Sequence, residues 1–555
     1  MVLDDILIRL TAGGARLSAV GAHDRAALAR TTARSVADAA DRWVDAALAI
    51  KQATREVAEA AAAEETSTGP IATLRLLAMT ARAWEEIGRT GLPRPAGQLR
   101  IPHAAGPASF VTVDLLPEPR LHDSAIFHGV QASVRCVNPG GIEAFRASWR
   151  SEVESRPLGG GVAAVLAAGN VTGLALSDVI DQIFGHGRAA LLKLHPLHAP
   201  LQSVYRDALA PLREAGLLEV IVGGADVAQV VVAAPAVTHV HLTGGRGAFD
   251  AVVWGEERAK RTAEPVLHKP ITCELGNLTP WLVVPGRYSP RQLRFQADLV
   301  AASILNNTSF NCIATKCVVT CRGWPQREEF LRLVAGRLGS MPPRLAWFPG
   351  AAAAWEEATG LAVPADGCLP WTFLTGIDPV RERRLVDREW FVPVATEVPL
   401  KADDIEEFCS QAAEFTHTLP GSLAASVTIP AALPAADAAR VELLVEHLRY
   451  GVVAVNTWSA LAYALGGVPW GGYPGSTLAE PASGIGHVHD PLLLPLVHNA
   501  ILRAPLAAWI TPPWLPWHPR ARQLATGVLG MYAAIARGKS GLGQLMRMLP
   551  AVLAG

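Results

Sequence analysis

The chain has 555 residues and half of them are hydrophobic, which is enough for two or three domains with sizeable cores. Its 49 basic side chains nearly balance 50 acidic ones, and the net charge of -1 leaves no whole-protein field that favours nucleic acid or an anionic surface. Seven cysteines at irregular spacing argue against a disulfide framework, and the first residues lack a secretory pattern, so the sequence predicts a cytoplasmic protein.

The N-terminal part is predicted to be helical. Residues 1 to about 95 are rich in Ala, Leu, Arg and Glu at helical spacing. Proline and glycine interrupt this pattern between Gly91 and Gly97, and a β-like run follows at residues 132–137. A region of mixed structure is therefore expected to begin there.

From Gly161 onward, strand and helix patterns alternate. Strands are expected at 162–166, 189–194, 218–222 and 237–242, and helices at 174–184, 202–215 and 227–233. Such alternation predicts βαβ units and a parallel sheet, in which ligands bind beyond the carboxyl ends of the strands. Loops with glycine or polar residues lie at three of these ends, at 168–170, 223–226 and 243–245.

Two glycine-containing stretches are candidates for phosphate binding. Residues 185–190 match a dinucleotide fingerprint that ends in alanine, but they leave a helix and enter a strand, which is the reverse of the required order. Residues 242–245 leave a strand and enter an expected helix, whose N–H groups can face a pyrophosphate. The second stretch is therefore the better candidate.

The polar loop at 306–316 carries Cys312 between a helix-like segment and a β-like run at 317–321. A cysteine nucleophile needs a polarised, partly open setting, whereas composition alone favours a buried packing residue. Upstream, Glu274 is a candidate general base and Asn170 a candidate donor for an oxyanion. Together the three residues favour an active-site loop.

Cys312, Cys317 and Cys321 also invite a metal interpretation, which we reject. Cys317 and Cys321 share one face of a β-like run, Cys312 precedes it in a loop, and no paired cysteine or histidine follows nearby. The two later cysteines are predicted to be packing residues.

Several short motifs follow one another in a characteristic order: Asn170, 192–193, 242–245, 274–276, 307–312, 389–393 and 469–472. This ordered set resembles the NAD(P)-dependent aldehyde dehydrogenase superfamily, as a divergent member, over about Gly161 to His487. The resemblance implies an α/β fold with a Rossmann-type parallel-sheet dinucleotide-binding domain and an α/β catalytic domain.

The resemblance also implies a reaction. Cys312 would add to an aldehyde as a thiohemiacetal, Asn170 and the Cys312 N–H would hold the oxyanion, and Glu274 would activate the water that hydrolyses the thioester. Glu274 favours hydrolysis over acyl transfer to coenzyme A, since a thiol needs no such base. Acyl-CoA or thioester reduction is the first alternative, and a catalytically silent scaffold or membrane-associated binding protein is the second.

NAD or NADP is the implied cofactor. The cofactor-binding residues would be Lys193, Gly223, Gly244, Gly245, Glu389 and Phe391. Pro196 stands where many NAD-specific members have a glutamate, which makes NADP admissible.

Other positions depart from the family pattern, namely Gly245, Asn277, Ser309, Phe310 and Val392. Bulk at Phe310 and Val392 is expected to narrow the approach to the thiol or to shift the nicotinamide.

The predicted division comprises a helical N-terminal part (1–120), an oligomerisation strand region (121–160), a dinucleotide-binding domain (161–275), a catalytic domain (276–490) and an apolar C-terminal extension (491–555). The apolar run 524–536 is too short to span a bilayer, so it predicts either a peripheral membrane anchor or a docked helix. A homo-oligomer, dimer or tetramer, acting on a small, lipophilic aldehyde is expected from the resemblance and the apolar tail.

Overall fold

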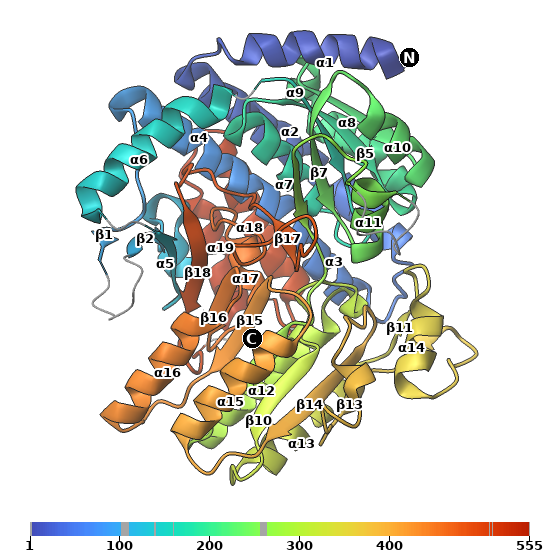
Figure 1. Ribbon diagram of the computed structural model, residues 1–555, viewed down its shortest axis with the longest axis vertical. Coiled ribbons are helices and arrows are strands. Elements are labelled where there is room, and N and C mark those ends of the chain that lie inside the picture. Colours follow the sequence, from blue (N-terminus) through green and yellow to red (C-terminus); the bar gives the residue numbers. More distant parts are fainter. Residues whose placement is uncertain are drawn as a thin grey trace.

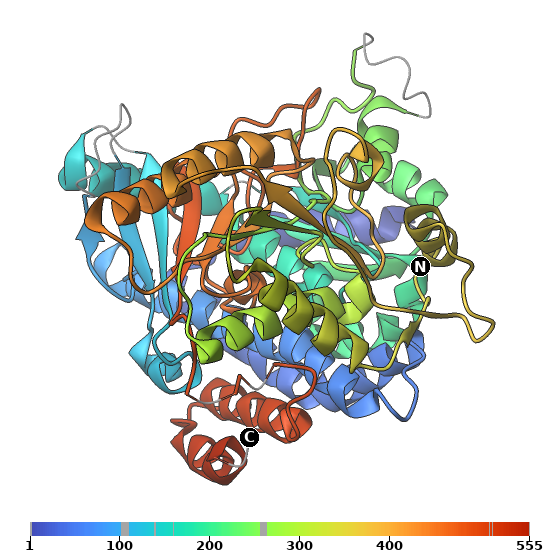
Figure 2. The ribbon, with the colours of Figure 1, turned by 90° about the horizontal axis from the view of Figure 1, so that it is seen from below.

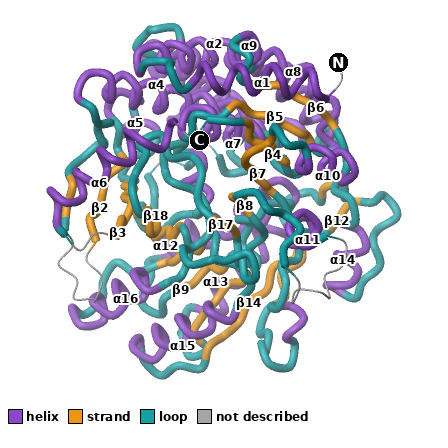
Figure 3. The backbone as a smooth tube through the Cα atoms, turned by 45° about the horizontal axis from the view of Figure 1, so that its top comes forward, coloured by secondary structure: helices purple, strands orange, loops and turns teal. Residues whose placement is uncertain are grey.

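The computed structural model describes residues 3–101, 110–137, 140–158, 160–255, 264–509, 511–512 and 514–553. Two sheets with helices around them form the body of the molecule (Figure 1). In Figure 3, strands β8 and β17 lie on the side of the smaller sheet that is nearer to the larger one. The predicted α/β class is confirmed.

The N-terminal part is helical, as predicted. Its helices are α1 (Leu3–Leu17), α2 (Ala22–Ile50), α3 (Ala58–Thr66) and α4 (Ala72–Thr90), the last two joined by a π-helical turn at Ser67–Ile71. Gly13 and Gly14 let α1 lie directly on the backbone of the smaller sheet, because a Cβ at either position would collide with the carbonyl oxygen of Gly216 or Gly161. Helix α1 therefore covers part of one side of that sheet.

The smaller sheet has six strands in the order β17-β8-β7-β4-β5-β6. Their bounds are β4 (Val162–Leu166), β5 (Ala189–Leu194), β6 (Leu218–Val222), β7 (Val237–Thr243), β8 (Ile271–Glu274) and β17 (Gly484–Ile485). All neighbours are parallel except β17, which runs antiparallel to β8. The predicted parallel sheet is thus confirmed.

The helices of this sheet are α7 (Leu174–Ile180), α8 (Gln202–Ala208), α9 (Ala210–Glu214), α10 (Ala225–Ala233) and α11 (Arg246–Trp254). The predicted helix 174–184 continues past α7 as a π-helical turn at Asp181–Gly185. The predicted helix 202–215 is broken at Leu209, because Pro211 has no N–H to continue the ladder.

The larger sheet has ten strands in the order β1-β2-β3-β18-β16-β15-β9-β10-β14-β13. Their bounds are β1 (Leu99–Arg100), β2 (Phe110–Leu116), β3 (Gln131–Val137), β9 (Pro280–Val283), β10 (Cys317–Cys321), β13 (Thr372–Leu374), β14 (Val394–Leu400), β15 (Ala424–Thr428), β16 (Val452–Val455) and β18 (Val497–Arg503). The strands from β18 to β13 are parallel, and β1 to β3 are antiparallel.

Helices and a small hairpin surround this sheet. They are α5 (Asp123–Ile126), α6 (Gly141–Ser155), α12 (Pro290–Leu305), α13 (Arg327–Gly339), α14 (Ala351–Thr359), α15 (Ile405–Thr418), α16 (Ala435–His447), α17 (Ala460–Ala464), β11 (Arg344–Leu345) and β12 (Cys368–Leu369). The strand predicted for oligomerisation, β3, is hydrogen-bonded on both sides within the chain, to β2 and to β18. Strand β18 is thus part of the larger sheet, although its residues fall within the predicted C-terminal extension. The boundaries between the domains stay predictions.

The chain closes with α18 (Ala521–Ala536) and α19 (Leu542–Leu553), at the edge of the molecule in Figure 2. Helix α18 is docked on α2, α3 and α4, which is the second of the two expected arrangements. Its Tyr532 hydroxyl contacts the buried guanidinium of Arg75 (2.8 Å), which also pairs with Asp123. Within the described ranges, no helix combines the length and apolarity that crossing a bilayer requires.

Candidate active site

The Cys312 loop is held in a strained conformation. Between α12 and β10, the consecutive residues Asn307, Thr308 and Ser309 have φ angles of 53°, 57° and 62°, in the left-handed region. Each costs roughly 1–2 kcal/mol for a residue with a Cβ. The Asn307 amide offsets part of this cost by donating to the carbonyl oxygens of Asn170 (3.0 Å) and Phe310 (2.8 Å). Such over-determined strain is typical of functional loops.

Lys316 fastens the other side of the loop. Its buried ammonium donates to the carbonyl oxygen of Ser309 (3.0 Å), the Ser309 hydroxyl (2.6 Å) and the carbonyl oxygen of Val392 (2.7 Å). Burial lowers the pKa of Lys316, and the Glu389 carboxylate acts against that shift. Three acceptors use all the donors of an ammonium, so the bonding favours the charged form.

Cys312 and Glu274 meet at the centre of the site. The Cys312 thiol donates to Glu274 Oε1 (3.3 Å), and the Trp470 indole N–H donates to Glu274 Oε2 (2.9 Å). Cys312 is partly exposed, whereas Glu274 is 3% exposed. The Glu274 carboxylate is therefore enclosed, whereas the thiol stays accessible from the pocket.

Burial controls the protonation of this pair. Burial, followed by the negative charge of Asp178, raises the pKa of Glu274 to about 7. Burial and the nearby Glu274 and Glu389 carboxylates raise the pKa of Cys312 well above its ordinary value. Above about pH 7, the resting pair is thus a thiol that donates to a carboxylate, and that carboxylate can accept the proton when the sulfur attacks.

Asn170 lies beside the loop. Its Nδ2 donates to the carbonyl oxygen of Phe310 (3.2 Å), and its side chain borders the pocket that contains Cys312. A primary amide has two N–H donors, so, among the described contacts, one stays available for a ligand.

A pocket of about 570 Å³ leads from Cys312 across the carboxyl ends of the smaller sheet. Each of the three predicted loops contributes to its wall. The predicted site residues that border it are Asn170, Lys193, Gly244, Gly245, Glu274, Cys312, Glu389 and Phe391. Gly223 precedes the bordering Gly224, and its carbonyl oxygen accepts a hydrogen bond from Lys193 Nζ (3.2 Å). The pocket therefore joins the candidate nucleophile to the candidate cofactor residues.

The walls of this pocket fit a dinucleotide. Gly224 and Gly245 directly precede α10 and α11, whose first N–H groups are suited to phosphate oxygens, and a Cβ at Gly245 would meet open space. Glu389 Oε1 is buried without a hydrogen bond in the described structure, so it suits a ligand hydroxyl. Glycine at 276 leaves the Glu389 carboxylate its position, because a Cβ there would collide with that carboxylate.

The expected narrowing by Phe310 and Val392 is not found. Both side chains are completely buried, and neither borders the pocket in the part of the chain that the structure describes. The Phe310 ring packs on Trp347 (5.2 Å between centroids), Phe348 (5.6 Å) and Phe391 (6.1 Å). It therefore fills the layer behind Phe391, away from the approach to the thiol.

The remaining sequence candidates lie elsewhere. Gly185 ends the π-helical turn before β5, and residues 185–190 do not border the pocket in the described structure. Cys317 and Cys321 are buried in β10, and among the described side chains no group of three potential ligands is placed to hold a metal ion.

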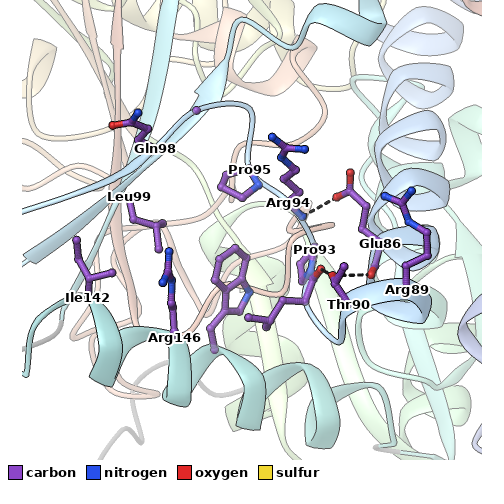
Figure 4. A pocket seen from close by; sticks show the side chains of 13 residues that line it. Glu86, Arg89, Thr90, Pro93, Arg94, Pro95, Gln98, Leu99, Ile142 and Arg146 are labelled. Carbon is purple, nitrogen blue, oxygen red and sulfur yellow. Dashed lines mark hydrogen bonds between the residues drawn. The ribbon is translucent and has the colours of Figure 1, made fainter.

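A second cavity, of about 630 Å³, lies between the end of α4, the segment 92–99 and α6 (Figure 4). Arg89, Arg94 and Arg146 border it together with apolar side chains, and the Arg94 backbone N–H donates to Glu86 (2.6 Å). It shares no bordering residue with the pocket at Cys312.

Sequence reasoning missed the roles of Trp470 and Lys316. Both stood inside quoted stretches, but their partners are distant in sequence, so no local pattern indicates the contacts with Glu274 and Val392.

No protein-family model and no curated protein matches the sequence. Solved structures do match. An NAD-dependent aldehyde dehydrogenase from Sinorhizobium meliloti aligns over 92% of this chain and 89% of its own, at 16% identity and a TM-score of 0.58.

Two further solved structures are similar to the same extent. A glyceraldehyde-3-phosphate dehydrogenase from Methanocaldococcus jannaschii, complexed with NADP, aligns over 90% and 94% of the two chains (12% identity, TM-score 0.59). An NADP-dependent glyceraldehyde-3-phosphate dehydrogenase from Bacillus halodurans aligns over 90% of both (16% identity, TM-score 0.58). The resemblance seen in the ordered motifs is thereby confirmed for the fold: the chain has the fold of the NAD(P)-dependent aldehyde dehydrogenases.

Proposed function

We propose that this protein oxidises an aldehyde to a carboxylic acid with NAD or NADP, using Cys312 as the nucleophile. The observation that carries the proposal is the 3.3 Å contact between Cys312 Sγ and Glu274 Oε1 at the end of a dinucleotide-sized pocket. An aldehyde cannot release hydride until its carbonyl carbon becomes tetrahedral, and a thiol beside a carboxylate supplies that addition.

In the first step, Cys312 Sγ bonds to the carbonyl carbon and its proton passes to Glu274. The carbonyl π electrons move to oxygen, which becomes an anion. The Asn170 amide and the Cys312 backbone N–H would donate to it, as fixed donors placed where charge develops. Removing one such donor typically slows acyl chemistry about 10²–10³-fold.

A nicotinamide dinucleotide bound in the pocket would accept the hydride that leaves the tetrahedral carbon. The acyl group then remains on Cys312 as a thioester. Glu274, after releasing its first proton, takes one from a water whose oxygen attacks the acyl carbon. The C–S bond breaks, the sulfur leaves as thiolate and takes the proton that Glu274 accepted from water, and the product is a carboxylic acid, which ionises. In neutral solution, two protons are released for each aldehyde oxidised.

Cofactor binding is assigned to Lys193, Gly223, Gly244, Gly245, Glu389 and Phe391, on the strength of their places around the pocket. Lys193 is the cation nearest the end of β5, and burial lowers its pKa, while Asp226 acts against that shift. Because Pro196 offers no carboxylate, a 2′-phosphate meets less repulsion here, so NADP is as acceptable as NAD. Calorimetric titration with each dinucleotide separates the two.

Water is the proposed acyl acceptor, because Glu274 lies within reach of Cys312 and is buried with a raised pKa. A thiol acceptor such as coenzyme A has no need of that base. Product analysis with and without coenzyme A distinguishes the outcomes: free acid supports hydrolysis, and acyl-CoA supports the thioester reductase alternative.

The deciding experiment follows reduced nicotinamide with a panel of aliphatic and aromatic aldehydes. Cys312→Ala is expected to abolish it. Glu274→Gln is expected to give at most about one reduced nicotinamide per site, formed more slowly than in the wild type and without turnover, since Glu274 takes the Cys312 proton in the addition and the water proton in the deacylation. Cys368→Ala is the matched control, because Cys368 is the other partly exposed cysteine. No reduction with any aldehyde, together with no dinucleotide binding, would reject the enzyme in favour of a silent binding protein.

The predicted homo-oligomer and peripheral membrane contact are part of this proposal. Helix α19 exposes Leu542, Met546 and Leu549, at 54%, 64% and 50%, which is the observation that favours contact with a lipid surface. Light scattering of the full chain measures the first, and co-sedimentation with anionic vesicles measures the second.

A further inference from the structure

Strand β7 is unusually polar for its position. It lies between β8 and β4 in a parallel sheet, where both faces are normally apolar, yet alternate positions carry His239, His241 and Thr243. All three are buried. Burying polar groups costs free energy unless they are hydrogen-bonded, so this face calls for a physical explanation.

The polar face continues onto β8. The register pairs Thr243 with Glu274 and His241 with Thr272, and directly opposite residues of neighbouring strands point to the same face. Thr243 and Glu274 end their strands and both border the pocket at Cys312. The candidate base is therefore the pocket end of a row of polar side chains.

Hydrogen bonds connect this row. Thr243 Oγ1 donates to Asp178 on α7 (2.8 Å) and lies 3.3 Å from His241 Nε2, which is 3.4 Å from the same carboxylate. His241 Nδ1 is 2.9 Å from Thr272 Oγ1, and Thr272 Oγ1 is 3.1 Å from His239 Nε2. We call Thr243, Asp178, His241, Thr272 and His239 the polar ladder. At about 3.3 Å per residue, it spans roughly 13 Å from Thr243 to His239.

The charges of the polar ladder suit a proton carrier. Burial acts to raise the pKa of Asp178, but His241 and His489 outweigh it and hold that pKa at about 2. Burial acts to lower the pKa of His241, but Asp178 outweighs it and raises that pKa. Burial, reinforced by neighbouring cations, lowers the pKa of His239 to about 3. His241 can thus carry charge beside a carboxylate, while His239 stays neutral.

Other ionisable groups face the polar ladder from the elements around it. They are Glu274 on β8, Asp181 and His186 at the end of the α7 segment, Arg188 before β5, and His489 near β17. The His186 side chain is 18% exposed, so the His239 end approaches solvent. Thr272 is also partly exposed.

Several buried atoms around the polar ladder make no hydrogen bond within the described structure. They include Asp178 Oδ1, His239 Nδ1 and His489 Nε2. A cavity of about 10 Å³ beside His489, Asp181 and Asp490 has the size of one water molecule. Polar atoms of this kind ordinarily bind internal water, which extends a hydrogen-bonded chain.

The proposed oxidation creates a need for such a chain. Two protons leave per turnover, and Glu274 must lose the one it took from Cys312 before it can activate water. Glu274 is 3% exposed, and dinucleotide and substrate would fill the pocket on its open side. Resting on the proposed function, we propose that the polar ladder conducts protons from Glu274 through the smaller sheet to the His239 end.

The transfer balances atom by atom. One water in the pocket would link Glu274 to Thr243. The proton passes through this water and the Thr243 hydroxyl to His241 Nε2. Asp178 stabilises the resulting imidazolium, and His241 releases the proton on Nδ1 to Thr272. The Thr272 hydroxyl gives its own proton to His239 Nε2 as His239 passes the one on Nδ1 to solvent water at that end. Before the next proton can pass, the hydroxyls rotate back and both imidazole rings return to their first tautomer, so no group changes its charge over the cycle.

Thr272→Val tests the polar ladder, because it removes one hydroxyl and keeps the shape of the side chain. Thr272→Ser retains the hydroxyl. Thr238→Val is the matched control: it is the same substitution on β7 outside the polar ladder, at an exposed register shift where Thr238 Oγ1 donates to the carbonyl oxygen of Val162 (3.3 Å). Each full-length variant is assayed for aldehyde oxidation and, with dinucleotide present to fill the pocket, for hydrolysis of p-nitrophenyl acetate, a reaction expected to need Cys312 and Glu274 but to consume no dinucleotide.

Thr272→Val is expected to give a rapid first turnover and then a kcat lower by about tenfold, with an unchanged KM, a larger solvent deuterium isotope effect and acceleration by added imidazole. Thr272→Ser is expected to restore kcat, and Thr238→Val to match the wild type. Equal steady-state rates in Thr272→Val and Thr238→Val, in both reactions, would overturn the polar ladder while leaving the aldehyde oxidation standing. Ester hydrolysis that shows the expected pattern without any aldehyde oxidation would support the polar ladder and reject the proposed function.

Discussion

Trp470→Phe is expected to move the pH at which the site becomes active. The Trp470 indole N–H donates to Glu274 Oε2 (2.9 Å), and a donor stabilises the ionised carboxylate. A hydrogen bond to a charged group contributes about 1.5–3 kcal/mol, and about 1.4 kcal/mol corresponds to one pKa unit, so losing it raises the pKa by about 1–2 units. Burial already raises the pKa of Glu274 to about 7.

Because Glu274 acts as a base only when ionised, activity rises with pH through its pKa. The acid limb of the kcat profile should therefore move from near 7 in the wild type to roughly 8–9 in Trp470→Phe. The assay is hydrolysis of p-nitrophenyl acetate across the neutral and alkaline range.

The matched control is Trp458→Phe, which removes the same atoms from another buried indole, whose N–H donates to the carbonyl oxygen of Ile313 (2.7 Å). An acid limb that stays in place in Trp470→Phe, or that moves equally in both variants, refutes the reasoning.

Three further substitutions test other parts of the structure. Asn170→Ala should lower kcat about 10²–10³-fold at nearly unchanged KM, measured by steady-state kinetics, since it removes a donor to the oxyanion. Gly276→Ala should displace the Glu389 carboxylate, because the added Cβ collides with it, and calorimetry should show weaker dinucleotide binding. Arg75→Met should lower the free energy of unfolding by about 3–5 kcal/mol in chemical denaturation, because it leaves the buried Asp123 carboxylate without its partner. Dinucleotide affinity unchanged in Gly276→Ala, or an unfolding midpoint unchanged in Arg75→Met, would contradict the respective contact.

The order of elements in the smaller sheet was predictable from local pattern. The strands expected between residues 162 and 242 are found at those bounds, with β7 longer by one residue. Continuous apolar runs bounded by glycine and polar turns are a strong signal for buried parallel strands. The place of β18 was not predictable, because its pairing with β3 and β16 joins segments far apart in sequence.

The candidate site was only partly predictable for the same reason. Cys312, Glu274 and Asn170 stood out by residue type and order, and the structure brings them to one pocket, although their roles stay proposals. The alternation of polar and apolar residues from His239 to Thr243 indicated the polar ladder. Reading it required the register with β8, which the sequence does not state.

The departures from the family pattern at Ser309 and Val392 are explained by their hydrogen bonds with Lys316. Ser309 occupies a left-handed position where glycine would carry no strain, but its hydroxyl and carbonyl oxygen both accept hydrogen bonds from Lys316, which offsets the cost of the Cβ. The third acceptor is the carbonyl oxygen of Val392, in the motif that also carries Glu389. The loop of the candidate nucleophile and the motif of the candidate cofactor carboxylate are therefore both bonded to one buried ammonium. A substitution in either segment would therefore change the position of the other. Ser309 and Val392 act together, through Lys316, to hold the loop that contains Cys312.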